Sequence, residues 1–238
     1  MKLAVAGFVC VALADAELKP DTIRAFDRYI SEAQPRLTRV REIREREVER
    51  IGAGKAEVPG GLIHDWVGAV FIPGTTLEKT LVLVRDYERH KQIYKPEVID
   101  SKLLARDGDT YRLHLRLLKE KVITVVLNTE HEARYYRIGP KQVRSESVST
   151  RIAEVERAGR PGEREKPPGE GHGFLWRLHS YWQFEERDGG VYVECEAISL
   201  TRNVPPGLGW VIEPVIRNLP RESLTNTLRA TREALREK

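Results

Sequence analysis

The sequence predicts an α+β fold, in which one face of a large antiparallel sheet is covered by a long C-terminal helix. Three observations lead to this prediction. Residues 180–202 alternate apolar and polar side chains on both sides of the turn Asp188-Gly189-Gly190, which is typical of a hairpin. Residues 98–202 as a whole consist of β-type segments joined by turn signals. An apolar stripe at helical spacing then runs from Leu208 to Leu235.

The N-terminus has the pattern of a secretory signal peptide. Met1-Lys2 precedes an apolar run that ends in the small-residue motifs Ala12-Leu13-Ala14 and Ala14-Asp15-Ala16. The run is too short to be a stable membrane anchor. We therefore expect residues 1–16 to be cleaved and the mature protein to be periplasmic or secreted. A buried first strand or helix is the alternative.

The segment that follows is predicted to contain three helices and two strands. The first helix covers 21–33, capped by Asp21 and closed by Pro35. Residues 36–51 are expected to divide into a helix and a short strand, and 64–72 to form a longer strand. Thr75 and Glu78 predict a capping box for a third helix that ends near His90.

The β-rich part is predicted to contain six strands, and one long loop interrupts them. The strands are expected at 98–106, 110–119, 121–135, 142–156, 174–187 and 191–202. The loop, residues 157–173, contains five glycines and three prolines in 17 residues. Such loops are usually lids or disordered excursions, and the composition favours disorder. Beyond the last strand, Pro214 and Pro220 are expected to bend or break the C-terminal helix.

The last predicted strand presents two different faces. Cys195 falls among its inward residues, so we expect a buried and inert thiol. The other cysteine, Cys10, would be removed with the signal peptide. Glu194 and Glu196 share the opposite face, which is predicted to be solvated and would lack the burial that raises a carboxylate pKa.

Two stretches of sequence resemble the START-like, or SRPBCC, proteins, and among these the bacterial polyketide cyclase/dehydrase-type members. They are "DWVGAVFIPGTTLEKTLVLVRDYERHKQIYKPEVIDSKLL" and "YWQFEERDGGVYVECEAISLTRNVPPGLGWVIEPVIRNLPRESLTNTLRATREAL". The resemblance covers roughly Gly61 to Arg236. It implies the helix-grip fold, a curved antiparallel sheet wrapped around a long C-terminal helix. The expected division is a signal peptide (1–16), a short N-terminal helical extension (17–56) and a START-like domain (57–238).

The resemblance also implies an apolar tunnel between the concave face of the sheet and the C-terminal helix. The small residues of the last strand are expected to let the helix approach closely, whereas the aromatic residues on its neighbour line the remaining space. For the aromatic residues, filling an ordinary core is the alternative. The candidate ligand-binding residues are Trp66, Tyr111, Leu113, Leu115, His131, Trp176, Trp182 and Phe184.

The sequence lacks the motifs of nucleophilic, nucleotide-dependent and zinc-dependent enzymes, so no catalytic residue is assigned. An inward His131 near Tyr111 could polarise a bound carbonyl group, although a satisfied structural histidine is the simpler interpretation. His172, His179 and Glu170 are a weak metal candidate, and strand alternation points His179 outward. No metal and no cofactor are predicted.

The charge pattern argues against a nucleic-acid partner. The net charge of +4 comes from 40 basic and 36 acidic residues that are interspersed, without interleaved aromatic residues for base stacking. The positive net charge is compatible with transient contact with an anionic membrane surface. The leading prediction is an exported monomer that binds a hydrophobic small molecule or lipid without catalysis. A cyclase- or aromatase-type enzyme and a scaffold with a packed cavity are the alternatives.

Overall fold

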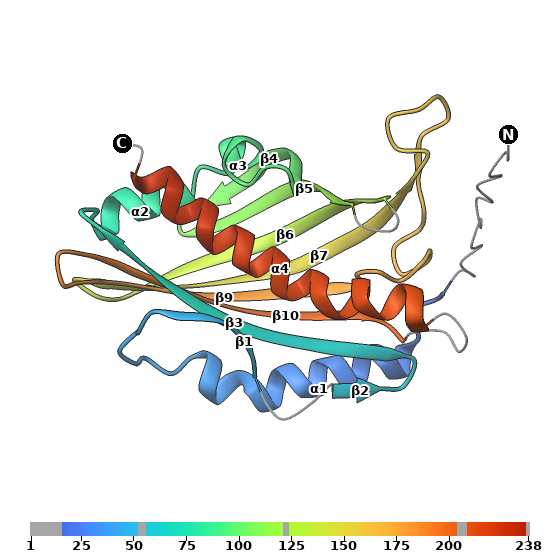
Figure 1. Ribbon diagram of the computed structural model, residues 1–238, viewed down its shortest axis with the longest axis horizontal. Helices are drawn as coiled ribbons and strands as arrows, with labels where there is room; N and C mark the ends of the chain where they lie inside the picture. The colour runs from blue at the N-terminus through green and yellow to red at the C-terminus, as the bar shows by residue number, and fades with distance from the viewer. Residues whose placement is uncertain (1–15, 52–55, 121–123, 204–208, 237–238) are drawn as a thin grey trace, which may run out of the picture.

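The computed structural model describes residues 16–51, 56–120, 124–203 and 209–236. A single curved antiparallel sheet carries helix α4 across its concave face, and helix α1 lies on the opposite side, along β3 (Figure 1). The helical elements are α1 (Pro20–Leu37), α2 (Leu77–Val84), the 3-10 helix η1 (Tyr87–Arg89), α3 (His90–Ile93) and α4 (Gly209–Arg236). Among these described helices, none combines the length and the apolar character needed to cross a membrane.

Within the described part of the chain the sheet has ten strands, and every pairing in it is antiparallel. Their bounds are β1 (Arg46–Arg50), β2 (Ala56–Val58), β3 (Gly61–Pro73), β4 (Val98–Asp107), β5 (Thr110–Glu120), β6 (Thr124–Gly139), β7 (Gln142–Glu156), β8 (Arg164–Glu165), β9 (Arg177–Arg187) and β10 (Gly190–Arg202). The main path is β1-β3-β10-β9-β7-β6-β5-β4, with β2 beside β3 and β8 beside β7. The six strands predicted between residues 98 and 202 are confirmed, as β4 to β7, β9 and β10.

The helices differ from the prediction in several places. Helix α1 begins at Pro20 with Lys19, and not Asp21, as its N-cap, and the helix expected within residues 36–51 is not formed beyond the end of α1. Pro35 lies inside α1, which continues to Leu37 because Ala33 and Leu37 are buried against the sheet and hold the last turn. Thr76 rather than Thr75 caps α2, and its hydroxyl oxygen accepts the Lys79 backbone N–H at 3.3 Å. That helix ends at Val84, so the predicted continuation to His90 is replaced by η1 and α3.

Helix α4 is not broken by its prolines. One helix of 28 residues runs through the positions of both Pro214 and Pro220. Its described apolar face, which includes Leu224 and Leu228, is buried on the concave side of the sheet. Packing of this described face therefore offsets the hydrogen bonds that proline removes.

The glycine-rich segment 157–173 is not a disordered excursion, so that prediction is wrong. Its strand β8 pairs with β7, and Arg116 on β5 makes two hydrogen bonds of 2.9 Å to the Glu163 carboxylate. At its far end Gly169 accepts a backbone hydrogen bond of 2.8 Å from Leu18. The polar composition reflects an ordered surface segment that is held by ion pairs.

Both faces of the central strands are covered. On the concave side, residues of α2 and α4 pack against β3, β9 and β10. On the convex side, α1 packs against β3, β9 and β10 through a second cluster that contains Phe26, Leu37, Trp176, Ile198 and Leu200.

The prediction of a solvated outer face is therefore wrong. Glu194 is 3% exposed and Glu196 is 5% exposed. Arg41 and Arg46 pair with Glu194, and Arg36 pairs with Glu196. Alternation showed that these carboxylates share a face, but it cannot distinguish water from a covering segment that supplies arginines.

Candidate functional site: an apolar cavity under the C-terminal helix

A cavity exists because four successive positions in one row of the sheet carry small side chains. Ala133 on β6 is paired with Ser147 on β7, which is paired with Ser180 on β9, and that residue is paired with Ala197 on β10. All four residues border an open volume of about 290 Å³. Since protein interiors are normally packed without voids larger than a water molecule, a space of this size needs an explanation beyond packing.

The remaining walls of the cavity are mostly hydrocarbon. Leu113, Leu115 and Leu117 border it from β5, since alternate residues of a strand share one face. Leu219 and Leu224 close it from α4. These three alternate leucines therefore form one part of the cavity wall.

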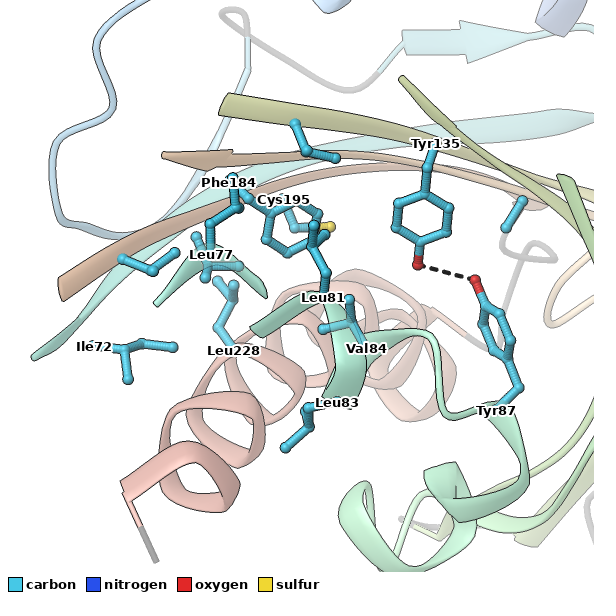
Figure 2. Close-up of a cluster of buried hydrophobic side chains, with 14 of the residues drawn as sticks. Ile72, Leu77, Leu81, Leu83, Val84, Tyr87, Tyr135, Phe184, Cys195 and Leu228 are labelled. Atoms are coloured by element: carbon cyan, nitrogen blue, oxygen red, sulfur yellow. Dashed lines mark hydrogen bonds between the residues drawn. The ribbon is translucent and has the colours of Figure 1, made fainter. Parts of the chain in front are cut away.

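A buried tyrosine pair borders the cavity. The hydroxyl groups of Tyr87 and Tyr135 point toward each other and are 3.0 Å apart (Figure 2). Phe184 and Cys195 lie near them in the same cluster and also border the cavity. Burial, with added repulsion from the Tyr135 phenol, raises the pKa of Tyr87 far above its usual range, and burial raises the pKa of Tyr135 as well. Both phenols are therefore neutral donors and acceptors at physiological pH.

A polar cluster borders the cavity where β5 and the start of β4 meet α4. The Lys119 ammonium pairs with Glu97 and donates to the Ser223 hydroxyl at 2.5 Å, and the Asn226 amide donates to Glu97 at 2.7 Å. Burial lowers the pKa of Lys119, although Glu97 opposes this effect. Burial alone would raise the pKa of Glu97, but Lys119, Asn226 and Ser223 together outweigh it and the pKa is lowered. The cluster joins the sheet to α4 and keeps both charges paired.

One histidine lies among the hydrocarbon walls. His131 on β6 is 4% exposed and borders the cavity, and its Nε2 is 3.0 Å from the Thr129 hydroxyl oxygen. Burial lowers the pKa of His131 to about 4, and the nearby His179 and His114 lower it further in the same direction. The imidazole is therefore neutral at physiological pH.

Five of the eight candidate ligand-binding residues border the cavity: Leu113, Leu115, His131, Trp182 and Phe184. The rings of Trp182 and Phe184 are stacked, with centroids 6.1 Å apart. The two side chains are neighbours on one face of β9, as alternation predicts.

The other three candidates lie elsewhere. Trp66 packs against the core beneath α4, and the guanidinium of Arg50 lies 4.9 Å from its ring centroid. Tyr111 packs behind the tyrosine pair, 5.4 Å from the Tyr87 ring and 5.6 Å from the Tyr135 ring.

Trp176 lies on the opposite side of the sheet, in the cluster under α1. The prediction placed it in a regular strand from residue 174, but β9 begins at Arg177. In the irregular lead-in both Phe174 and Leu175 border the cavity, so alternation does not hold there. The candidate assignment of Trp176 to the ligand-facing side is therefore corrected.

The close approach of the helix occurs at a different strand from the one predicted. A Cβ atom on Gly68 of β3 would lie 2.9 Å from Leu228 of α4 and 2.6 Å from Val48 of β1. Only glycine leaves room for both neighbours at this point. The small residues of β10, including Ala197 and Ser199, border the cavity instead.

Ser145, Ser147 and Tyr87 also border the cavity, and the sequence pattern did not indicate this. The serines occur at alternate positions of β7, so they lie on one face of the strand. Because serine is polar, the sequence suggests that this face contacts solvent. Tyr87 follows the end of α2 in a stretch that was predicted to be a continuous helix.

The residues of the weak metal candidate do not come together as a metal site. His172 bonds to Glu154 through Nδ1 at 2.9 Å, whereas the His179 ring lies against Phe26 of α1 with centroids 5.2 Å apart. Within the described residues, no group of three or more histidine, cysteine, aspartate or glutamate side chains is placed to hold a metal ion.

Comparison with known proteins identifies the fold. No protein-family model and no curated protein matches the sequence. The solved structure of TTHA0849 from Thermus thermophilus is similar, with a TM-score of 0.52, 17% identity, and coverage of 73% of this chain and 97% of that one. A STAR-related lipid transfer protein from Xanthomonas axonopodis matches with a TM-score of 0.49 and 18% identity over 77% of this chain and 98% of its own. The Zhui aromatase/cyclase from Streptomyces sp. R1128 matches with a TM-score of 0.45 and 10% identity over 74% and 94%.

The chain has the START-like helix-grip fold, as the resemblance implied. Its curved antiparallel sheet and long C-terminal helix are the defining parts of that fold. The likeness extends to the fold alone, so the function has to be argued from the cavity.

Proposed function

We propose that the protein binds one compact apolar molecule in the cavity between the sheet and α4, without covalent chemistry. The observation that carries this proposal is the row of small residues, Ala133, Ser147, Ser180 and Ala197, beneath hydrocarbon walls. A volume of about 290 Å³ is near the lower end of typical ligand sites, roughly 300–1,000 Å³. It suits a single chain or a small ring system better than a two-chain lipid.

The cavity chemistry favours binding over a cyclase- or aromatase-type reaction. A general acid or base works best when its pKa lies near the operating pH. His131, with a pKa of about 4, is a weak base. The two tyrosine phenols stay protonated, and Lys119 and Glu97 neutralise each other.

The proposal includes the setting in which binding takes place. The pattern of residues 1–16, which lie almost wholly outside the described part of the chain, supports export to the periplasm or beyond. There the protein would act as a monomer that holds a hydrophobic molecule away from water. Transient contact with an anionic membrane surface would be a route for loading.

Two measurements test binding. Native mass spectrometry of the gently purified mature protein should reveal a co-purifying apolar molecule. Titration with the apolar dye Nile red should quench or shift tryptophan fluorescence saturably, because Trp182 borders the cavity. Trp182→Phe should reduce the response, whereas Trp176→Phe is the matched control, since Trp176 lies under α1.

The outcomes separate binding from the scaffold alternative. A saturable response that depends on Trp182 and not on Trp176 supports the proposal. A protein that carries no ligand and takes up no apolar probe would act as a scaffold, and the proposal would be rejected.

A further inference from the structure

The hydrogen bonds of His131 fix which of its ring nitrogens carries the proton. The Thr129 hydroxyl donates to the backbone carbonyl oxygen of Leu115 at 3.0 Å, and its oxygen lies 3.0 Å from His131 Nε2. A hydroxyl group has a single proton, and a carbonyl oxygen can only accept. Both contacts are hydrogen bonds only if His131 donates its Nε2–H to Thr129. In the neutral ring, Nδ1 is then an unprotonated acceptor.

This acceptor faces the cavity. Among the described residues, no protein group is hydrogen-bonded to His131 Nδ1. Nor is Nδ1 one of the described unpartnered side-chain atoms that are sealed from open space. Since the side chain is otherwise buried and borders the cavity, the open space at Nδ1 belongs to the cavity.

We infer that the ligand is an apolar alcohol or phenol, whose hydroxyl group donates a hydrogen bond to His131 Nδ1. This inference rests on the proposed function and names the chemical class that the site selects. A polar group buried without a partner is costly, so a bound molecule that cannot donate leaves the imidazole unsatisfied. The hypothesis that His131 polarises a ligand carbonyl requires a donor at this position, and the Thr129 bond removes it.

The tautomer can be tested directly. A long-range ¹⁵N–¹H NMR correlation distinguishes the protonated from the unprotonated ring nitrogen of each histidine, and His131→Phe assigns the signals. We expect a proton on Nε2 and none on Nδ1 at neutral pH. A proton on Nδ1 would overturn the inference.

Ligand selectivity is tested with two molecules of nearly equal size, 2-decanol and 2-decanone, in competition with Nile red. The alcohol can donate a hydrogen bond and the ketone cannot. We expect the wild-type protein to bind the alcohol about three- to tenfold more tightly. His131→Phe should abolish the preference, because it keeps a ring of similar size and removes the acceptor.

Two further variants serve as controls. His114→Phe makes the same change on the neighbouring strand, at a residue that does not border the cavity, and should leave the preference intact. Thr129→Val frees either ring nitrogen to carry the proton, so the preference should shrink while His131 is retained. Thermal unfolding of each variant establishes that it is folded before its selectivity is interpreted.

The possible failures are distinguishable. If both decane derivatives displace Nile red equally well, or if the ketone binds more tightly, the inference is wrong and the binding function stands. If wild-type protein takes up neither Nile red nor either compound, the proposed function fails together with the inference.

Discussion

Ser147 on β7 and Ser180 on β9 are direct partners in the antiparallel pairing, and both side chains border the cavity under α4. Neither residue fills the space that a leucine or phenylalanine would fill at the same place. The void therefore depends on side-chain size at a few paired positions, and it can be removed by changing one of them.

Filling the cavity should separate binding from folding. We expect Ser180→Phe to fold with a stability within about 1 kcal/mol of wild type, because the phenyl ring enters open volume instead of a packed core. The same variant should lose most of its Nile red binding. Ser101→Phe is the contrasting change: Ser101 is fully buried, bonds to Lys91 and Glu88, and does not border the cavity.

Overpacking at a well-packed site costs about 1–3 kcal/mol, and the lost hydrogen bonds at Ser101 add to that. Urea unfolding of both variants measures the difference. Equal, large destabilisation of the two would mean that the space beneath α4 is closed in solution.

The ion pairs under α1 predict a pH-dependent stability. Arg36 bridges the buried carboxylates of Asp65 and Glu196. Burial raises the pKa of Asp65 above its ordinary value of 3.8, although Tyr29 and Arg36 oppose the shift. The folded state therefore binds the Asp65 proton more tightly than the unfolded state does. Its contribution to stability is most favourable at low pH and declines as the pH rises from 3.8 through the raised value.

Removing the arginine should strengthen this dependence. Arg36→Met leaves two buried carboxylates without their counter-charge and should cost on the order of 3 kcal/mol at pH 7. The cost should fall as the pH is lowered through the raised pKa of Asp65, because that carboxyl group then takes up a proton, and Asp65→Asn should restore part of the loss. Arg24→Met is the control, since Arg24 pairs with Asp21 in the solvent and should change stability by about 0.5 kcal/mol or less. A cost that does not vary with pH would contradict the argument.

The sequence predicted the strands well because alternation and turn residues report local structure. It was less informative about which faces are covered. Glu194 and Glu196 have the pattern of a solvated face, and their burial depends on arginines about 150 residues earlier in the chain. Ser147 has the same polarity as a surface residue, although it lines the cavity. Side-chain polarity alone does not show whether a residue contacts water, forms a buried ion pair or borders a cavity.

Irregular segments explain the other differences in the site. Trp176 precedes the first regular residue of β9, so no periodicity fixes its side of the sheet. Tyr87 borders the cavity because α2 ends at Val84. The sequence from α2 to Tyr87 has helical spacing, so it predicts that the helix continues past this point. Five candidates that belong to regular strands border the cavity, whereas Trp66 and Tyr111 show that an inward side chain can be part of the core.

If the protein is exported by its signal peptide, cleavage should give the mature chain a defined N-terminus. Expressed with its full sequence in a Gram-negative host, the protein should appear in the periplasm and begin after Ala14 or Ala16. N-terminal sequencing of the periplasmic fraction measures this. An Ala14→Lys and Ala16→Lys double variant should accumulate uncleaved, because small residues are needed at the cleavage site. Cytoplasmic protein with Met1 intact would show that the apolar run has another role.

The thiol of Cys195 should be unreactive in the folded protein, although it borders the cavity. The residue is 1% exposed, and burial, followed by the charge of Glu194, raises its thiol pKa well above the ordinary value of 9.0. The thiolate is the reactive form, so both access and ionisation are restricted. In a Cys10→Ser background, we expect a polyethylene-glycol maleimide to leave the native protein unmodified at about pH 7.5 and to label it fully in urea.

An accessible thiol on the same chain calibrates the rate of this reaction. Val82 on α2 is 70% exposed, so Val82→Cys should be labelled once in the native state, within the time in which Cys195 remains unmodified. The raised pKa of Cys195 also makes stability depend on pH. The folded state holds the thiol proton more tightly than the unfolded state does, so Cys195 lowers stability as the pH rises above 9.0. Cys195→Ala should remove that decline. If Cys195 reacts in the native protein as fast as a cysteine at position 82, β10 would have to present this face to solvent. The cavity could then not lie where the small residues place it.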